Sequence, residues 1–255
     1  MIKNATRAKL KAGQVVYGFR MDFSSAPVVE SLGDTGYDFV YFDLEHGPMS
    51  EESCLEMIRT AEMVGLTPLV RVPSGNPGMV QRLLDSGVLG IIFPHCNTRQ
   101  EAVAAVEMVK FPPEGHRGIA GRSLSLSRMS VADYVREANR ETLVIAMIEE
   151  KEALDNLDDI LTVAGLDVLF IGRLDLSLSL GIPGEINHRL IEDAVDTIIT
   201  RGEAAGKAVG VGAINVADTD SARQFREKGA RFFALNTVNI LTGAAVSLLK
   251  RLKAD

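Results

Sequence analysis

The stretch VGLTPLVRVPSGNPGMVQRLLDSGVLGIIF, residues 64–93, contains one complete unit of the expected fold. Short apolar runs at Thr67–Val70 and Gly90–Phe93 have the length and composition of buried strands. Pro77–Ser86 lies between them and has the apolar spacing of an amphipathic helix. A glycine comes just before each strand, as is common where a helix ends in a left-handed turn. The stretch therefore predicts a strand, a helix and a second, parallel strand.

The same alternation continues over the whole chain. The predicted strands are eight short runs rich in Val, Ile, Leu or Phe, at Val15–Phe19, Phe39–Asp43, Thr67–Val70, Gly90–Phe93, Leu143–Ile148, Val168–Ile171, Ala208–Val211 and Arg231–Leu235. The predicted helices are Glu51–Val64, Pro77–Ser86, Arg99–Val109, Ala153–Ala164, Leu190–Ala205, Thr219–Lys228 and Asn239–Leu252. This pattern favours an α/β fold, a (β/α)8 TIM barrel formed by one domain over residues 1–255. An open doubly wound sheet is the alternative, but GFRMDFSS after the first strand is not its phosphate-binding glycine fingerprint.

One connection is longer than the others. Residues 111–141 contain FPPEGHRG and then a Ser/Arg-rich stretch, GRSLSLSR. Long loops inside a compact domain are usually functional. We therefore expect an extended βα loop over the mouth of the barrel at about residues 111–141.

Composition limits the kinds of partner. The formal charge of −7 argues against nucleic-acid or anionic-membrane surfaces, which need clustered Lys and Arg. No apolar run has the length of a signal peptide core or a membrane span, so we expect a cytoplasmic protein that acts on small molecules. Cys54 and Cys96 lack the spacing of a zinc site, and we expect both to be free thiols.

Polar residues follow several predicted strands. In a TIM barrel, catalytic side chains project from the carboxyl ends of the strands. The charged or polar residues just after strands two to six are Asp43, Glu45, His46, Arg71, His95, Glu149, Glu150 and Asp175. Any one carboxylate there is more often a helix N-cap, but convergence from five strands favours an active site.

Five motifs in order carry a family resemblance: YDFVYFDLEHGPM, PLVRVPSGNPGMVQRLLDSG, FPPEGHRG, MIEEKEALDNLDDIL and FIGRLDLSLSLG. From about Ala8 onward the chain resembles the 4-hydroxy-2-oxoheptanedioate aldolase family, metal-dependent class II pyruvate aldolases that include 2-dehydro-3-deoxyglucarate aldolase and macrophomate synthase. The resemblance implies a lyase with a phosphoenolpyruvate/pyruvate-type barrel. Its reaction would be reversible cleavage of a 4-hydroxy-2-oxo acid to pyruvate and an aldehyde, via a metal-bound enolate.

The resemblance also implies roles for individual residues. Glu149 and Asp175 would be the ligands of a divalent ion, and two hard oxygen ligands suit Mg²⁺, Mn²⁺ or Co²⁺. Glu150 competes with Glu149 for that role, and the resemblance selects Glu149. His46 would transfer protons, oriented by Asp85.

Arg71 would contact the ketone or enolate oxygen of the substrate. The alternatives are that Asp85 caps a turn and that Arg71 pairs with Asp43 or Glu45. Otherwise Asp43 and Glu45 are expected to support the ligands or their waters. His95 stays open between a catalytic role and a place in the pocket wall.

Substrate-binding residues are expected at both sides of the mouth. Backbone amides of Gly172, Arg173 and Leu174 would hold the carboxylate of the 2-oxo acid. Arg20 and Arg173 depart from better-known members of the family, which often have an aromatic residue and Pro-Ala at these places. If both arginines point inward, they either bind an acidic aldehyde or pair with carboxylates, for which the candidates are Asp22, Glu45 and Glu150.

Other functions and assemblies stay open. Oxaloacetate decarboxylation gives the same enolate, and a non-catalytic 2-oxo-acid-binding barrel is a third possibility. Lys151 is the lysine nearest to a strand end, but it lies inside the following helix, so no Schiff base is expected. The resemblance implies a homohexamer in which Ile240–Leu252 packs on a neighbouring subunit, although the amphipathic pattern alone would also allow packing on its own barrel.

Overall fold

The eight strands form a closed parallel barrel in chain order, β1 to β8. The computed structural model describes residues 3–73, 76–120, 125, 127–214 and 219–254. The strands are β1 Val16–Met21, β2 Phe39–Asp43, β3 Thr67–Arg71, β4 Gly90–Phe93, β5 Leu143–Ile148, β6 Val168–Ile171, β7 Ala208–Ile214 and β8 Phe232–Asn236. The predicted TIM barrel is confirmed, and the open sheet is excluded.

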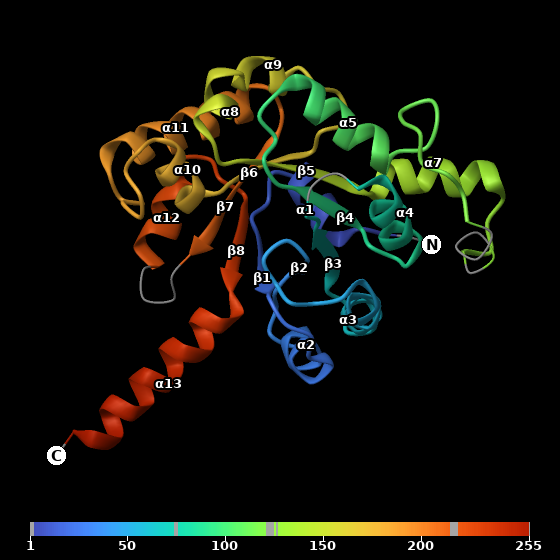
Figure 1. Cartoon of the computed structure of the whole chain (residues 1–255). Helices are drawn as coiled ribbons and strands as arrows, with labels where there is room; N and C mark the ends of the chain where they lie inside the picture. Colours follow the sequence, from blue (N-terminus) through green and yellow to red (C-terminus); the bar gives the residue numbers. More distant parts are fainter. Residues whose placement is uncertain (1–2, 74–75, 121–124, 126, 215–218, 255) are drawn as a thin grey trace.

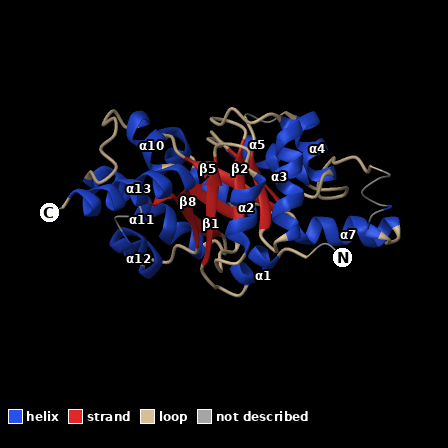
Figure 2. Ribbon diagram, turned by 90° about the horizontal axis from the view of Figure 1, so that it is seen from below, coloured by secondary structure: helices blue, strands red, loops and turns tan. Residues whose placement is uncertain are grey.

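Helices surround the strands, as Figure 2 shows. They are α1 Ala5–Lys11, α2 Ala26–Gly33, α3 Glu51–Met63, α4 Pro77–Asp85, α5 Arg99–Val109, α7 Val131–Glu141, α8 Lys151–Asp155, α9 Leu157–Leu161, α10 Arg173–Ser179, α11 Arg189–Ala204, α12 Thr219–Glu227 and α13 Thr237–Lys253. The helix predicted over Ala153–Ala164 is in fact two short helices. They are separated by Asn156, whose side-chain amide donates to the carbonyl of Asn97 at 2.9 Å.

The inside of the barrel is packed with apolar side chains. Successive side chains on a strand point to opposite faces, so every second residue faces the axis. The inward residues that form this buried column are Val16, Phe39, Tyr41, Leu69, Ile92, Leu143, Ile145, Met147, Val168, Phe170, Phe232 and Ala234. The outward residues pack instead against the helices in a second, larger core.

The amino-terminal end of the barrel is closed by the segment that contains α1. The side-chain amide of Asn4 donates to the carbonyl of Leu89 at 2.8 Å, just before β4. The hydroxyl of Thr6 donates to that of Thr67 at 2.8 Å, at the start of β3. Chemistry is therefore expected at the opposite end, where the strands finish.

The described parts of the long connection, residues 111–120, 125 and 127–141, lie at the amino-terminal end of the barrel, so the predicted place over the mouth is wrong for them. The connection joins α5 to β5, and its second part is the helix α7. Tyr134 and Thr142 line a cavity together with Thr67 and Leu89, which lie where β3 and β4 begin. An αβ connection necessarily runs back to the start of a strand. Most of the Ser/Arg-rich stretch, residues 121–124 and 126, lies outside the described residues.

The last helix, α13, projects away from the barrel (Figure 1). Its apolar side chains are exposed, including Leu241 at 65% and Leu252 at 73%. Elsewhere Cys54 and Cys96 are buried free thiols, as predicted. Within the described part of the chain, no helix combines the length and the apolar character needed to cross a membrane.

Candidate active site

A polar layer covers the apolar column at the carboxyl ends of the strands. It arises because the inward alternation of each strand continues for one more step: Val16 and Gly18 lead to Arg20, and Tyr41 leads to Asp43. The inward positions of this layer are Arg20, Asp43, Arg71, Glu149, Gly172, Gly212 and Asn236. Strand register places Arg20 beside Asn236 and Asp43 beside Arg71. The periodicity that packs the core therefore also assembles this layer.

Arg71 and Asp43 form a buried two-point ion pair. Arg71 Nε donates to Asp43 Oδ1 at 2.9 Å, and Arg71 Nη2 donates to Asp43 Oδ2. Burial alone would raise the pKa of Asp43, but the hydrogen bond and charge of Arg71 hold this pKa below its usual range. Arg71 Nη1 also lies 3.1 Å from Glu45 Oε2. These contacts fix the orientation of the guanidinium. Arg71 thus pairs with both carboxylates that the sequence analysis offered as its partners, Asp43 and Glu45.

Arg20 is balanced by two carboxylates. Its Nε donates to Asp22 Oδ1 at 2.5 Å, and its Nη2 lies 2.7 Å from Asp43 Oδ2. Asn236 Nδ2 donates to the other oxygen of Asp22 at 3.1 Å. Of the carboxylates expected to balance Arg20, Asp22 does so, whereas Glu45 pairs with Arg71.

Glu149 and Asp175 follow neighbouring strands, β5 and β6, and the charge of Asp175 acts on Glu149. Glu149 is 1% exposed at the end of β5, and Asp175 is in the first turn of α10. A Cβ atom at Gly172 would lie 2.5 Å from Glu149 Oε2, so the glycine leaves room for this carboxylate. Burial raises the pKa of Glu149 to about 7, and the charge of Asp175 adds to the rise.

Two acidic groups of this kind fit a divalent cation. Without a cation, their mutual repulsion and the burial of Glu149 both disfavour ionisation. Within the described residues, no cluster of three or more His, Cys, Asp or Glu side chains has the arrangement of a metal site. The pair Glu149 and Asp175 would therefore need water or substrate oxygens to complete the coordination of an ion.

His95 holds Glu149 in place. Its backbone amide donates to Glu149 Oε1 at 2.9 Å, and its φ of 52° is in the left-handed region, which is rare for residues other than glycine. The ring Nδ1 lies 2.7 Å from Glu150 Oε1, and Nε2 lies 3.3 Å from Glu45 Oε1. Asn97 Nδ2 donates to Glu150 Oε2 at 2.9 Å. Glu150 is thus engaged at the rim, while Glu149 faces the barrel axis.

His46 lies at the rim and is well exposed. Its backbone amide donates to Asp43 Oδ1 at 3.3 Å, and its ring Nε2 lies 3.8 Å from Glu45 Oε2. The imidazole is 55% exposed and therefore accessible to a substrate. In this chain its acidic neighbour is Glu45.

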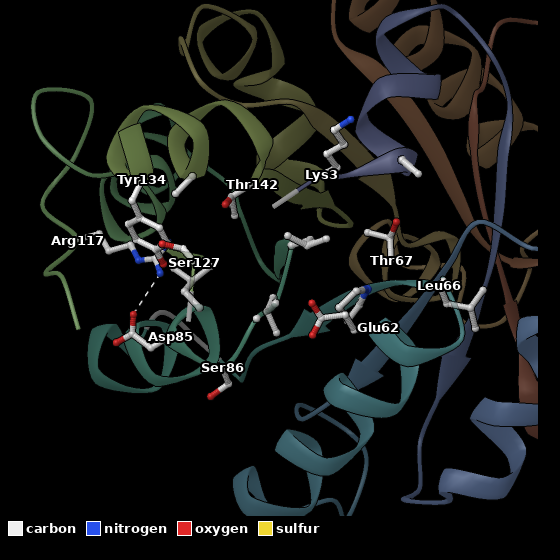
Figure 3. Close-up of a pocket in the computed structure, with 18 residues that line it drawn as sticks. Lys3, Glu62, Leu66, Thr67, Asp85, Ser86, Arg117, Ser127, Tyr134 and Thr142 are labelled. Atoms are coloured by element: carbon white, nitrogen blue, oxygen red, sulfur yellow. Dashed lines mark hydrogen bonds and ion pairs between the residues drawn. The ribbon is translucent and has the colours of Figure 1, made fainter. Parts of the chain in front are cut away.

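Asp85 is at the opposite end of the barrel, so the expected His46–Asp85 pair does not form within one chain. Asp85 ends α4, which runs antiparallel to the strands, and it accepts hydrogen bonds from Gln81 at 2.7 Å and Arg117 at 3.1 Å. Asp85 and Arg117 line a cavity of about 370 Å³ (Figure 3). A helix that follows a strand carries its last residue back to the strand's amino-terminal end, here by about 13 Å over nine residues.

Arg173 turns away from the mouth. It is 6% exposed, and its guanidinium carbon lies 5.1 Å from the centre of the Phe225 ring on α12. Leu174 is 55% exposed beside it, and Gly172 forms the N-cap of α10. The assumption that Arg20 and Arg173 both point inward is therefore correct for Arg20 and wrong for Arg173, whose side chain packs against a neighbouring helix.

Asn236 is a residue of the polar layer that the sequence analysis missed. The predicted last strand stopped at Leu235, one residue too early. Asn236 shares the inward parity of Phe232 and Ala234, so extending that alternation by one step would have identified it.

Comparisons with known proteins find matches over most of the chain. A family model described as HpcH/HpaI aldolase/citrate lyase matches residues 19–239. A hydroxypyruvate/pyruvate aldolase from Paraburkholderia phytofirmans is 33% identical over 238 residues, covering 91% of this chain and 90% of that protein. A 5-keto-4-deoxy-D-glucarate aldolase from Shigella boydii is 33% identical over 234 residues, with coverages of 92% and 90%. The crystal structure of an HpcH/HpaI aldolase/citrate lyase family protein from Burkholderia cenocepacia has a TM-score of 0.91 at 32% identity, covering 99% of this chain and 100% of that one.

Proposed function

The chain belongs to the HpcH/HpaI aldolase/citrate lyase family, and from this premise we propose that it cleaves a 4-hydroxy-2-oxo acid reversibly to pyruvate and an aldehyde. It is a carbon–carbon lyase with an aldolase barrel. The observation that carries the proposal is that Glu149, Asp175, Arg71 and His46 come from four different strand ends at the same end of the barrel. A purely structural barrel has no need of buried acidic and basic groups at that position.

The proposed cofactor is a divalent ion, Mg²⁺, Mn²⁺ or Co²⁺, held by Glu149 and Asp175. When bound, such an ion would act as a Lewis acid toward the 2-oxo acid. The carboxylate of the substrate is proposed to bind the backbone amides of Arg173 and Leu174. The amide of Gly172, also expected there from the sequence, donates instead to the carbonyl of Ile148 at 3.3 Å. The protein contributes the orientation of Glu149, through the His95 amide, and the buried surroundings that strengthen charge interactions.

The bond changes assign roles to Arg71 and His46. In cleavage, a base takes the proton of the 4-hydroxyl group, the bond between C3 and C4 breaks, and its electron pair goes to the pyruvate fragment as an enolate. C4 leaves as the aldehyde carbonyl. We propose that His46 takes this proton and returns it to C3 of the enolate, which gives pyruvate, and that Arg71, held by Asp43, stabilises the negative charge on the 2-oxo oxygen.

Activity is expected to need a divalent ion and no Schiff base. Lys151, the lysine nearest to a strand end in the sequence, directs its ammonium group to Asp155 at 2.5 Å on the surface. Pyruvate release from a panel of hydroxy-oxo acids and oxaloacetate should stop on chelation and return with Mg²⁺, Mn²⁺ or Co²⁺. Borohydride added with pyruvate should not inactivate the protein. Inactivation by borohydride combined with resistance to chelators would contradict the metal-dependent reaction.

We also propose a cytoplasmic homo-oligomer, a hexamer by family resemblance, in which α13 of one subunit packs on another. Two observations support the packing: the exposed leucines of α13 and a groove of about 470 Å³ on the outer face of β1 and β8, lined by Tyr17, Phe233 and Leu235. In such an assembly, Asp85 of one subunit is our proposed partner for His46 of the next.

Replacing Leu241 and Leu249 together by Asp is expected to shift the protein to a smaller species, because the two charges would be buried at the interface. Sedimentation velocity measures this shift. The matched control is Met63→Asp, at an apolar residue of α3 that is 71% exposed. An unmodified protein that sediments as a stable monomer would exclude the assembly.

A further inference from the structure

Among the described residues, the inward positions at the mouth of the barrel differ in the side chains they carry. The inward positions at the ends of β6 and β7 are glycines, Gly172 and Gly212, which contribute no side chain to the polar layer. A Cβ atom at Gly212 would lie 3.0 Å from the ring of Phe170, so this ring forms the floor there. Gly212 lies next to β8, because β7 pairs with β8 and β8 pairs with β1.

At the ends of β8 and β1, three polar side chains bind one another. Asp22 accepts from Arg20 through Oδ1 and from Asn236 through Oδ2, at 2.5 and 3.1 Å. The side chains of Arg20 and Asp22 are 25% and 24% exposed, so both are held in place yet accessible. Arg20 and Asn236 thus offer hydrogen-bond donors beside Asp22, which is an anionic acceptor.

The charge balance at this edge disfavours a second anionic group. Arg20 and Arg71 face three carboxylates, Asp22, Asp43 and Glu45, so the arginines are already outnumbered. An acidic aldehyde would have to displace Asp22 or Asp43 from Arg20 to gain its own pair. A hydroxyl group has no such conflict, since it both donates and accepts a hydrogen bond.

We propose that Arg20, Asp22 and Asn236 form a subsite for the hydroxyl group of a neutral hydroxyaldehyde, the aldehyde that is released from or added to pyruvate. This inference rests on the proposed aldolase function and names its substrate class. It replaces the acidic aldehyde considered from the sequence, in which Arg20 would have bound a carboxylate. Asp22 is the specificity-determining acceptor, and Arg20 and Asn236 orient it.

The test uses aldol addition of pyruvate to three small aldehydes: glycolaldehyde with a hydroxyl group, acetaldehyde without one, and acidic glyoxylate. The readout is the ratio of kcat/KM values between two aldehydes, which cancels any common loss in handling pyruvate. Asp22→Asn is expected to lower the glycolaldehyde-to-acetaldehyde ratio roughly ten- to a hundredfold, the contribution of one hydrogen bond to a charged group. Asp158→Asn, at an exposed surface pair with Arg201, is the charge-matched control and should leave the ratio unchanged.

Arg20→Met separates hydroxyl binding from acid binding. The hydroxyl subsite predicts a lower glycolaldehyde-to-acetaldehyde ratio and no selective loss of glyoxylate. Selective loss of glyoxylate, or an unchanged ratio in a folded Asp22→Asn variant, would overturn the inference. Exchange of pyruvate methyl protons with solvent is measured in parallel without aldehyde. If the unmodified protein exchanges these protons but shows no preference for glycolaldehyde, only this inference is wrong. If it shows no exchange with any divalent ion, the proposed function is wrong, and the inference that rests on it is wrong as well.

Discussion

Replacing either Glu149 or Asp175 by alanine is expected to abolish both retention of a divalent ion and release of pyruvate. A site with two protein carboxylates has no spare protein ligand to hold the ion once one is removed. The two carboxylates follow neighbouring strands, β5 and β6, and Glu149 is buried, so an alanine there leaves the charge of a cation uncompensated. Isothermal titration with Mn²⁺ measures retention independently of turnover.

Two further variants make this result specific. Glu150→Ala removes the same charge from the neighbouring residue, which binds His95 and Asn97 at the rim, and should keep the ion. Glu149→Gln keeps an acceptor for the His95 amide and should unfold no more easily than the unmodified protein when chelator is present, because the buried carboxylate is costly without a cation. If Glu150→Ala lost Mn²⁺ binding and Glu149→Ala kept it, then Glu150, and not Glu149, would be the metal ligand.

Replacing His46 by alanine should have a different effect. The variant is expected to keep Mn²⁺ and pyruvate, because His46 lies at the exposed rim and is not one of the two carboxylates. Proton transfer should fall by about a hundred- to ten-thousandfold, the usual contribution of a positioned acid or base. Exchange of pyruvate methyl protons with D₂O, followed by NMR, measures this step without any aldehyde.

A histidine remote from the barrel mouth provides the control. His116 is 77% exposed and lies 3.7 Å from Glu107, far along the chain from any strand end. His116→Ala should exchange pyruvate protons like the unmodified protein. An unchanged exchange rate in His46→Ala would remove His46 from the mechanism and leave the proton transfer to another group of the site.

Local pattern predicted the fold and the reaction class because both depend on short stretches of sequence. Four of the eight strand ranges agree residue for residue with the structure, at β2, β4, β5 and β6. Each is a run of large apolar residues whose burial determines the backbone conformation. The lyase class followed from motifs at strand ends, and it agrees with the family match. Errors arose at boundaries, such as Leu235 for Asn236, where a polar residue still belongs to the strand.

The sequence by itself determined which residues face the barrel axis, because alternation along a strand is a local property: Asp43, Arg71 and Glu149 all follow from it. Only the tertiary structure decided which of these groups meet. Asp85 lies in the same sequence motif as Arg71. It is nevertheless at the other end of the barrel, because the helix α4 runs between them. Arg173 packs on Phe225, and Arg20 is neutralised by Asp22 and Asp43, since pairing depends on distances across elements that no local pattern contains. The sequence of a strand thus predicts which way a side chain points, whereas the closure of the barrel determines which charged group it pairs with.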